Sequence, residues 1–187
     1  MFSVYEMLCE GDLPIPEKNK KAGRMVAFYL PIDVASELSN KFSNFPGDAV
    51  DPSDLHITLA LIQKGENKDV LKTLRHMAKY LKPFKVYVNG AGMFLPNKYN
   101  EYSNVLYAKP ESSLFGGIHS NLLRLLNKKP GITADNGKHE FKPHITLKYC
   151  KKDHPPLEQR GPWFTFDVDH LALGDKGEKY IVKFGGK

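Results

Sequence analysis

The chain has 187 residues, of which 41% are hydrophobic and 26% are charged, so it has the composition of a soluble globular protein with one good-sized core or two small halves sharing one. Its net charge of +6 and pI near 9.1 indicate a polyanionic partner such as nucleotide or RNA phosphates, and a merely soluble basic surface is the alternative. No apolar run approaches the roughly eighteen residues of a membrane span, so we expect no contact with a membrane.

The N-terminal region is predicted to be an appendage. Residues 1–23 combine Pro and acidic residues with a lysine-rich run at 18–21, and such runs are usually solvated. The first eight residues lack the basic start of a signal peptide, so we expect a cytoplasmic protein. Cys9 and Cys150 form no Cys-x-x-Cys pair, which fits free thiols and no structural zinc. The folded domain is expected at 24–187.

The first half of that domain alternates strands and helices. In chain order the pattern predicts a strand at 25–30, a helix at 33–42, a loop at 43–54, a strand at 55–62, a helix at 69–81 and a strand at 84–94. Asp33 is the expected N-cap of the first helix, and Pro83 ends the second. Gly90 and Gly92 inside the last strand indicate a bulge or a close approach by another segment or a ligand.

The second half repeats this plan. The pattern predicts a turn at 95–102, a strand at 104–108, a helix at 113–127, a loop at 129–140, a strand at 141–149, a loop around 155–162, and strands at 163–173 and 179–184. Ser112 or Ser113 is the expected N-cap of the helix. Helices interleaved with strands on a shared core indicate an α/β or α+β sandwich.

Two identical tetrads occupy the predicted strands at 55–62 and 141–149. They are His56-Ile57-Thr58-Leu59 and His144-Ile145-Thr146-Leu147. Successive side chains of a strand alternate between faces, so each tetrad offers an imidazole and a hydroxyl on one face and two apolar side chains on the other. The duplication predicts two lobes related by a pseudo-twofold axis, which would bring the two His/Thr faces together across a cleft.

The groups on these faces suit one kind of chemistry. Two facing imidazoles can act as general base and general acid, and two hydroxyls can hydrogen-bond the non-bridging oxygens of a phosphate held between them. Neither tetrad strand carries Asp or Glu on the His/Thr face, and neither Ser nor Cys adjoins the histidines in sequence, which disfavours a metal site or a nucleophile triad. We therefore predict metal-free acid–base cleavage of a phosphodiester.

The paired His-x-Thr-x motifs, the second introduced by Phe-x-Pro-His, resemble the 2H phosphoesterase superfamily, which includes proteins called 2′-5′ RNA ligases and cyclic phosphodiesterases. The resemblance covers about residues 24–184. It implies an α+β fold, a bilobal pseudo-twofold sandwich of two antiparallel sheets with outer helices and a central groove. It implies His56 and His144 as the acid–base pair and Thr58 and Thr146 as phosphate ligands. It also implies action without a cofactor on 2′,3′-cyclic phosphates, 2′-5′ linkages or cyclic oligonucleotides.

Further side chains near the second tetrad are candidate ligands. Lys148 continues the face of the second tetrad by strict alternation, so it is a candidate phosphate ligand, and a strand-end lysine reaching solvent is the alternative. Phe141 and Tyr149 are candidate substrate-binding residues that could stack a base, as could Tyr99 and Tyr102 in the turn. Packing in the core or on the surface is the other interpretation for each ring.

The remaining histidines lack a threonine two residues later. His76 and His119 fall in predicted helices and are expected to be partly exposed, and His139, His154 and His170 are expected to be structural or solvent-exposed. His139 and His154 could also border the groove.

Two classes of function fit the sequence. One is a phosphodiesterase acting on a nucleotide or RNA, with 2′-5′ ligation as the reverse reaction, and the other is a non-catalytic RNA- or nucleotide-binding module on the same fold. Two matched imidazoles favour the enzyme, because binding alone does not require them. We expect a monomer without an obligate protein partner. The loops at 43–54, 95–103 and 129–140 are expected to set the size of the substrate.

Overall fold

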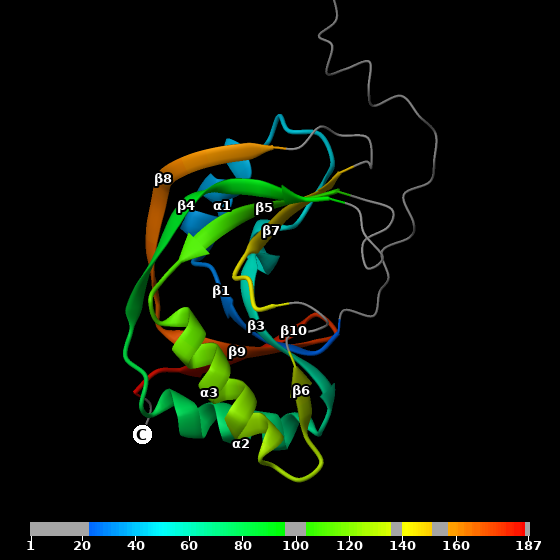
Figure 1. Ribbon diagram of the computed structural model, residues 1–187, viewed down its shortest axis with the longest axis vertical. Coiled ribbons are helices and arrows are strands. Elements are labelled where there is room, and N and C mark those ends of the chain that lie inside the picture. Colours follow the sequence, from blue (N-terminus) through cyan, green and yellow to red (C-terminus); the bar gives the residue numbers. More distant parts are fainter. Residues whose placement is uncertain (1–22, 96–103, 136–139, 151–156, 186–187) are drawn as a thin grey trace, which may run out of the picture.

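The computed structural model describes residues 23–95, 104–135, 140–150 and 157–185. Within these residues, antiparallel strands form one curled sheet, and three α-helices cover its outer surfaces (Figure 1). None of the described helices is long and apolar enough to cross a membrane.

The elements follow in chain order. They are β1 (Met25–Tyr29), α1 (Ile32–Lys41), β2 (Asp48–Ala49), the 3₁₀ turn η1 (Pro52–Asp54), β3 (His56–Lys64), α2 (Asn67–Ala78), β4 (Phe84–Phe94), β5 (Asn104–Glu111), α3 (Phe115–Asn127), β6 (Thr133–Asp135), β7 (Ile145–Cys150), β8 (Glu158–Val168), β9 (His170–Asp175) and β10 (Glu178–Lys183).

The strand order reads β10-β9-β1-β3-β7-β5-β4-β8, which divides into two equivalent halves at its centre. We call β10, β9, β1 and β3 the first lobe, and β7, β5, β4 and β8 the second lobe. The short strands follow the same symmetry, because β2 precedes β3 but pairs with β7, while β6 precedes β7 but pairs with β3. The pseudo-twofold relation expected from the duplicated tetrads is therefore visible in the pairing.

The two lobes are joined between β3 and β7, where the one bridging pair is Ile57 with Ile145. The predicted α+β fold with outer helices is confirmed. The two expected sheets, however, are two parts of one curled sheet, because this isoleucine pair connects them. The apolar side chains of both lobes also form one continuous core, which runs from Val26 and Phe28 in β1 to Leu106 in β5.

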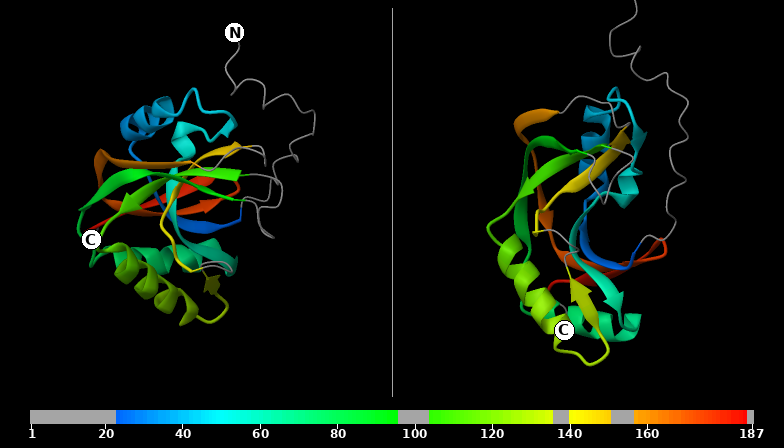
Figure 2. Two further views of the ribbon diagram at one scale, coloured as in Figure 1. Left: turned by 45° about the horizontal axis from the view of Figure 1, so that its top comes forward. Right: turned by 45° about the vertical axis from the view of Figure 1, so that its right-hand side comes forward.

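Each half of the chain contributes to both lobes. Strand β4 of the first half lies in the second lobe, and β9 and β10 of the second half return to the first lobe. The end of α1 packs on the second lobe, where the Phe42 ring lies 5.5 Å from the Trp163 ring of β8. Helix α2 packs on β9 and β10, and α3 on β3 and β6 (Figure 2).

The helices bury apolar stripes at helical spacing. On α2 the buried stripe includes Val70, Leu74 and Met77, as the sequence indicated, and on α3 it includes Ile118 and Leu122. Removing a side chain of this size from water stabilises the fold by about 1.5–3 kcal/mol. Because each stripe faces the sheet, the opposite face of each helix is left to solvent.

Several predicted helix boundaries shift by a few residues. Pro31 occupies the N-cap position of α1, and Asp33 lies inside the first turn, where a carboxylate favours the positive end of the helix dipole. Helix α3 starts at Phe115 after Leu114, so neither predicted serine is its N-cap. The Ser112 hydroxyl instead accepts a weak 3.4 Å bond from the Leu114 amide.

The strand boundaries differ more in the second half. The second motif strand begins at Ile145 rather than at residue 141, and the predicted strand 163–173 is two strands in different lobes. The break comes at Asp169, whose carboxylate binds the Lys183 ammonium at 2.7 Å and His170 Nδ1 at 2.8 Å. Strand β8 runs through the position of the loop predicted before 163. The predictions for the appendage, Tyr99, Tyr102, His139 and His154 concern positions outside the described residues.

Candidate active site

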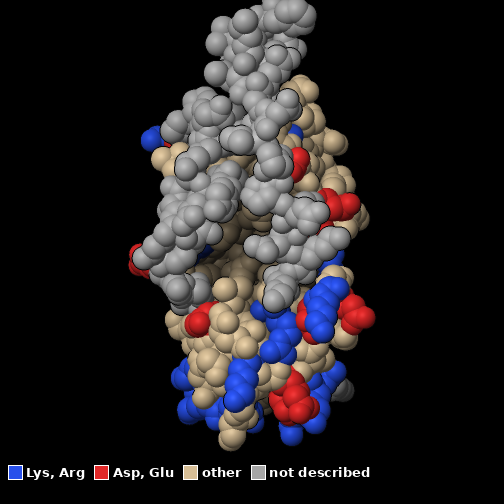
Figure 3. Space-filling view, turned by 90° about the vertical axis from the view of Figure 1, so that its right-hand side faces the viewer, with Lys and Arg blue, Asp and Glu red and all other residues tan. Residues whose placement is uncertain are grey.

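The two tetrads meet at the centre of the sheet. Because the isoleucines of both tetrads pair in antiparallel register, extending the register by one residue sets His56 next to Thr146 and Thr58 next to His144. Each imidazole therefore neighbours the hydroxyl of the other tetrad. All four side chains are half-buried and share one face of the sheet. Figure 3 shows a hollow in the molecule on the side where the two lobes meet.

Both imidazoles are held in the same way by the backbone. His56 Nδ1 lies 2.6 Å from the Asp54 carbonyl oxygen, and His144 Nδ1 lies 2.8 Å from that of Lys142. A carbonyl oxygen can only accept, so Nδ1 carries the proton in both rings and donates it. In the neutral ring Nε2 is then the basic atom. The backbone thus fixes the tautomer and the orientation of both rings.

The electrostatic surroundings of the two rings differ. Burial is the largest cause that lowers the pKa of both His56 and His144. The Asp54 carboxylate opposes this at His56 by raising the pKa, and the Lys179 ammonium adds to the lowering. At His144 the neighbouring charges are His56 and Lys142, and both lower the pKa further. His56 is therefore the ring that has a carboxylate to stabilise its protonated form.

A tyrosine adjoins each imidazole. The Tyr29 ring centroid lies 5.4 Å from that of His56, and the Tyr107 centroid lies 6.1 Å from that of His144. Strands β1 and β5, which carry these tyrosines, occupy equivalent positions in the two lobes. The sequence reasoning missed both tyrosines, because they lie outside the tetrads and share no motif with each other.

A glycine opposite each tyrosine leaves room for its ring. A Cβ atom on Gly174 would lie 2.8 Å from the Tyr29 hydroxyl, and one on Gly92 would lie 2.9 Å from the Tyr107 hydroxyl. Either distance is a clash. The sequence analysis interpreted Gly92 as a bulge or a close approach, and the close approach is the one found.

A lysine lies over the aromatic ring on each side of the site. The Lys179 ammonium is 4.7 Å from the centre of the Tyr29 ring, donates to the Ser53 carbonyl at 2.6 Å and pairs with the Asp54 carboxylate at 2.7 Å. These contacts tie strand β10 to η1, which carries the carbonyl that holds His56. Lys179 therefore supports the segment leading into the first tetrad.

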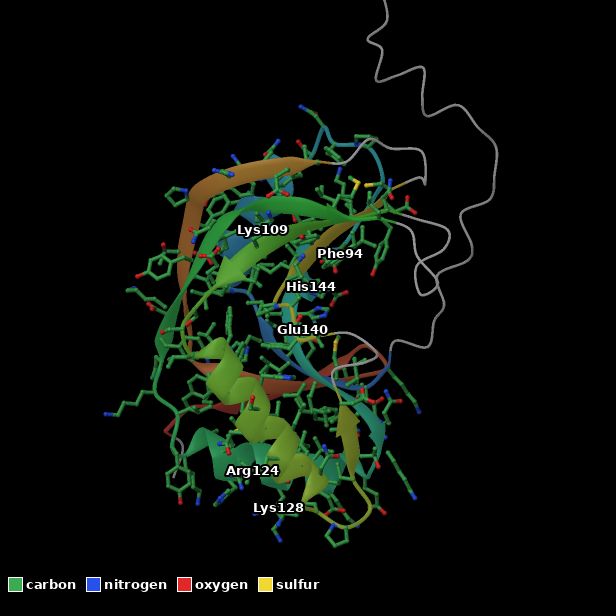
Figure 4. All side chains as sticks on the ribbon, viewed as in Figure 1. Phe94, Lys109, Arg124, Lys128, Glu140 and His144 are labelled. Atoms are coloured by element: carbon green, nitrogen blue, oxygen red, sulfur yellow. The ribbon has the colours of Figure 1, made fainter. Side chains whose placement is uncertain are left out.

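On the other side, Phe94 and Tyr107 form a stacked pair with centroids 4.0 Å apart. The edge of this pair faces His144, whose centroid is 5.0 Å from that of Phe94 (Figure 4). The exposed Lys142 places its ammonium 5.0 Å from the Phe94 ring and 5.1 Å from the Tyr107 ring. Partly exposed Phe94 thus gives the site an aromatic surface that the sequence reasoning also missed.

The expectation that Lys148 shares the face of the second tetrad is wrong. Between Thr146 and Lys148 strand β7 contains one more residue than β5, so a bulge at Leu147 reverses the alternation. Lys148 is buried on the opposite side, where its ammonium donates to the Ser43 carbonyl at 3.1 Å and also to that of Phe45. Desolvation lowers the pKa of Lys148.

The same irregularity occurs in the first tetrad. Strand β3 has its extra residue at Leu59, between the partners of Val26 and Ala27 in β1. Ala60 therefore faces the core, as Lys148 does in the second lobe. The identical fourth residue of both tetrads is thus a bulge position, which strict alternation cannot reveal.

The two predicted aromatic ligands have different surroundings. Phe141 stacks on His119 with centroids 3.8 Å apart and planes within 2°, so this histidine covers one of its faces. Tyr149 is 42% exposed and, with the bulge counted, lies on the same face as Thr146. Tyr149 is the more exposed of the two rings, and substrate binding by either one stays a prediction.

His119 is buried rather than partly exposed, and it connects the two tetrad strands. Its Nδ1 donates to the carbonyl oxygen of Leu59 at 2.7 Å, at the bulge of β3, and its ring stacks on Phe141, three residues before His144. The apolar positions around it in α3 could have indicated this burial, because Ile118 and Leu122 lie on the same side of the helix. His76 is exposed, as expected.

Within the described residues, no group of three or more His, Cys, Asp and Glu side chains is arranged to hold a metal ion. The Thr58 hydroxyl contacts Met25 Sδ at 3.7 Å, a weak bond that a phosphate oxygen could replace. What the site offers is two oriented imidazoles and two hydroxyls around one point.

Known proteins share this arrangement of the chain. A sequence profile described as the 2′-5′ RNA ligase superfamily matches residues 33–179. No match to the sequence was found among curated proteins. Among solved structures, TT0787 of Thermus thermophilus is 26% identical with a TM-score of 0.63, and the match covers 87% of this chain and 98% of that one.

Structures of E. coli LigT show the same fold at lower identity. The complex with 3′-AMP is 18% identical with a TM-score of 0.62, and the complex with NADP⁺ is 18% identical with a TM-score of 0.61. Each match covers 87% of this chain and 94% of LigT.

Proposed function

The chain belongs to the 2′-5′ RNA ligase superfamily, and on this basis we propose that it is a metal-independent phosphodiesterase of the 2H type that acts on nucleotide or RNA phosphodiesters. The observation that carries the proposal is the matched pair of Nδ1–H bonds to backbone carbonyls, which leaves Nε2 of His56 and His144 as the working atoms. A histidine with a purely structural role does not require the same backbone hydrogen bond to be repeated by a second histidine on another motif strand.

The reaction follows from these groups. With a 2′,3′-cyclic phosphate between the tetrads, neutral His144 takes a proton from water through Nε2, and the water oxygen attacks phosphorus. The bond from phosphorus to one ester oxygen breaks, and protonated His56 gives its Nε2 proton to that leaving oxygen. The two rings end with their protonation states exchanged, and solvent restores them. Ligation would follow the same path with the 5′-hydroxyl of a second RNA chain in place of water, and its reverse would cleave the linkage formed.

The remaining groups bind the phosphate and the nucleoside. The hydroxyls of Thr58 and Thr146 donate to the non-bridging oxygens as negative charge develops on them. Phe94 and Tyr149 offer aromatic surfaces on either side of the second tetrad, where a base can stack. Binding of nucleotides by LigT, in its complexes with 3′-AMP and NADP⁺, supports a nucleotide substrate here. We propose residues 24–187 as one domain with the site between its lobes.

The assignment of roles rests on the unequal charges around the rings. Asp54 stabilises protonated His56, and Lys142 disfavours protonated His144, so His56 starts as the acid and His144 as the base.

The test is turnover of 2′,3′-cyclic mononucleotides, 2′-5′ dinucleotides and cyclic oligonucleotides by the purified protein, with and without EDTA. We expect turnover that survives EDTA. His56→Ala and His144→Ala should each lower kcat by about 10²–10⁴-fold, and the double variant should lose little more than the worse single one, because the groups act as a unit.

Two outcomes contradict the proposal. One is retained turnover in either single variant whose circular dichroism spectrum is unchanged. The other is activity that EDTA abolishes and one divalent metal restores. Nucleotide binding without turnover of any substrate would favour the non-catalytic binding module instead.

A further inference from the structure

Beyond the first turn of α2, where Asp69 is exposed, the outer surface of α2 and α3 is strongly basic. No Asp or Glu occurs at positions 70–83 or 112–134, which include most of both helices. These two segments contain seven cations, which we call the helix-layer cations: Lys72, Arg75, Lys79, Lys82, Arg124, Lys128 and Lys129. All seven are exposed. The summed positive charge of these seven side chains exceeds the net charge of +6 of the whole chain, so the remaining residues together are close to neutral.

The helix-layer cations lie on a common side because of their spacing. Lys72, Arg75, Lys79 and Lys82 follow one another at intervals of three or four residues. Lys72 and Arg75 lie on α2 opposite its buried stripe, Lys79 is the C-cap residue, and Lys82 lies in the segment after the helix. Arg124 and Lys128 have the same spacing on α3, and Figure 4 shows both at the outer side of that helix, away from the sheet. Because α2 and α3 pack against each other, the two stripes belong to one surface.

None of these cations has a carboxylate partner among the described residues, a property that they share with Lys41, Lys64, Lys142, Lys148 and Lys176. Elsewhere the structure pairs lysines with carboxylates: Lys68 with Glu66, Lys85 with Asp167, Lys109 with Glu158, Lys179 with Asp54 and Lys183 with Asp169. Within the described chain, none of the helix-layer cations forms such an ion pair. A merely solvated surface would mix both signs of charge.

The basic surface lies within reach of the groove, though not inside it. Strand β3 leads from His56 at the site to Lys64 just before α2, and nine extended residues span roughly 26 Å. Figure 3 shows Lys and Arg side chains, with some Asp and Glu side chains among them, at the lower end of the molecule, on the side where the hollow opens. At about 3.4 Å per nucleotide of a stacked strand, that span corresponds to roughly eight nucleotides, which is a lower bound because it ends before the first helix-layer cation, Lys72.

We propose that the helix-layer cations bind the phosphate backbone of an RNA chain whose reacting phosphodiester lies between the tetrads. The substrate is then a polynucleotide longer than about eight nucleotides, and mono- and dinucleotides are poor mimics of it. We choose RNA as the ligand because of charge complementarity: several cations without carboxylate partners match the evenly spaced phosphates of an RNA chain. This inference rests on the proposed phosphodiesterase function and names its substrate class.

The experiment compares the full chain with a quadruple variant, Lys72→Gln, Arg75→Gln, Arg124→Gln and Lys128→Gln. Its matched control is Lys85→Gln with Lys183→Gln, which removes two cations that already have carboxylate partners. Substrates are a 2′,3′-cyclic mononucleotide and an RNA of about 20 nucleotides ending in the same group, chosen to exceed the estimated span. Binding of the RNA is measured separately, by fluorescence anisotropy, in the His56→Ala background.

We expect the quadruple variant to bind the long RNA about tenfold more weakly or worse, and the slope of log K against log salt to shrink by roughly 3 for four lost phosphate contacts. Its kinetics on the mononucleotide, and all properties of the control variant, should be unchanged.

An equal loss on both substrates, or unchanged RNA binding in the quadruple variant, overturns the inference. So does binding of vesicles containing phosphatidylserine that depends on the four cations while RNA binding does not. Absence of turnover on every substrate would contradict the proposed function. The RNA-binding measurement does not depend on catalysis, so it would still test whether the helix-layer cations bind RNA.

Discussion

The two imidazoles of the site share their backbone contacts and differ in the charges around them. His56 has the Asp54 carboxylate and the Lys179 ammonium beside it, while His144 has Lys142 and His56 itself. The pseudo-twofold symmetry of the strands therefore does not extend to the charged side chains around the two histidines. The pH dependence of turnover should therefore distinguish the two rings.

The first prediction concerns the alkaline limb of the kcat/KM profile, which reports the acid. In Asp54→Asn the carboxylate that raises the pKa of His56 is gone, and the Lys179 ammonium is left uncompensated. The pKa of His56 then falls, so the alkaline limb should move to lower pH while the acidic limb stays in place. If the acidic limb moved instead, His56 would be the base.

Lys142→Met should act on the other limb. Removing this cation raises the pKa of His144, so the base is protonated at higher pH and the acidic limb should move upward. Lys72→Met, which removes an exposed cation of α2, is the control and should shift neither limb. A rise in KM with both limbs unmoved would make Lys142 a phosphate ligand only.

At the residue scale, the sequence was sufficient to place the four tetrad side chains together, because the identical tetrads lie on strands that pair at Ile57 and Ile145. It was insufficient for Lys148, since a bulge obeys no pattern of residue types in a single sequence. It was also insufficient for Tyr29, Tyr107 and Phe94, whose importance comes from strand pairing across distant segments.

At the scale of elements, α3 has a role beyond covering the sheet. Through His119 it holds the Leu59 carbonyl at the bulge of β3 and supports Phe141 before β7. The helix thereby sets the position of both tetrad strands relative to each other. Helix periodicity predicted its apolar side, but the hydrogen bond depends on a bulge in another element.

Two substitutions of His119 separate its contacts. His119→Phe keeps a ring against Phe141 and loses the bond to Leu59, so a buried carbonyl is left unpaired and the free energy of unfolding should fall by about 1–3 kcal/mol. His119→Asn can still donate from its amide and loses the stack. We expect kcat to fall more in the Phe variant than in the Asn variant, because the bond holds the first tetrad.

Urea unfolding and single-turnover rates measure both effects. A Phe variant with full kcat and reduced stability would show that His119 only stabilises the fold, while a larger loss in the Asn variant would assign the positioning role to the stack.

At the scale of the whole molecule, the two lobes exchange segments of the chain. Helix α1 and strand β4 of the first half serve the second lobe, while β9 and β10 of the second half complete the first. Neither half of the sequence can therefore bury its apolar faces alone. Strand and helix types were predictable from local patterns, but this exchange depends on long-range pairing.

The exchange predicts one cooperative unfolding transition. Trp163, the single tryptophan, lies in the second lobe, whereas α2 and α3, with 12 and 13 residues against 10 in α1, dominate the helical signal from the first. Tryptophan fluorescence and circular dichroism at 222 nm should give coincident urea transitions. Separate midpoints for the two probes would show that the lobes unfold independently.

The axis between the tetrads also has a consequence for the regiochemistry of the product. A 2′,3′-cyclic phosphate presents two ester oxygens that differ only in their sugar positions, and either can face His56 if the nucleotide turns about the axis. Which oxygen leaves is then decided by whatever anchors the rest of the substrate, not by the imidazoles. A mononucleotide, anchored only through its base at Phe94 and Tyr149, would yield more of the second isomer than a long strand that is also held on the helix layer.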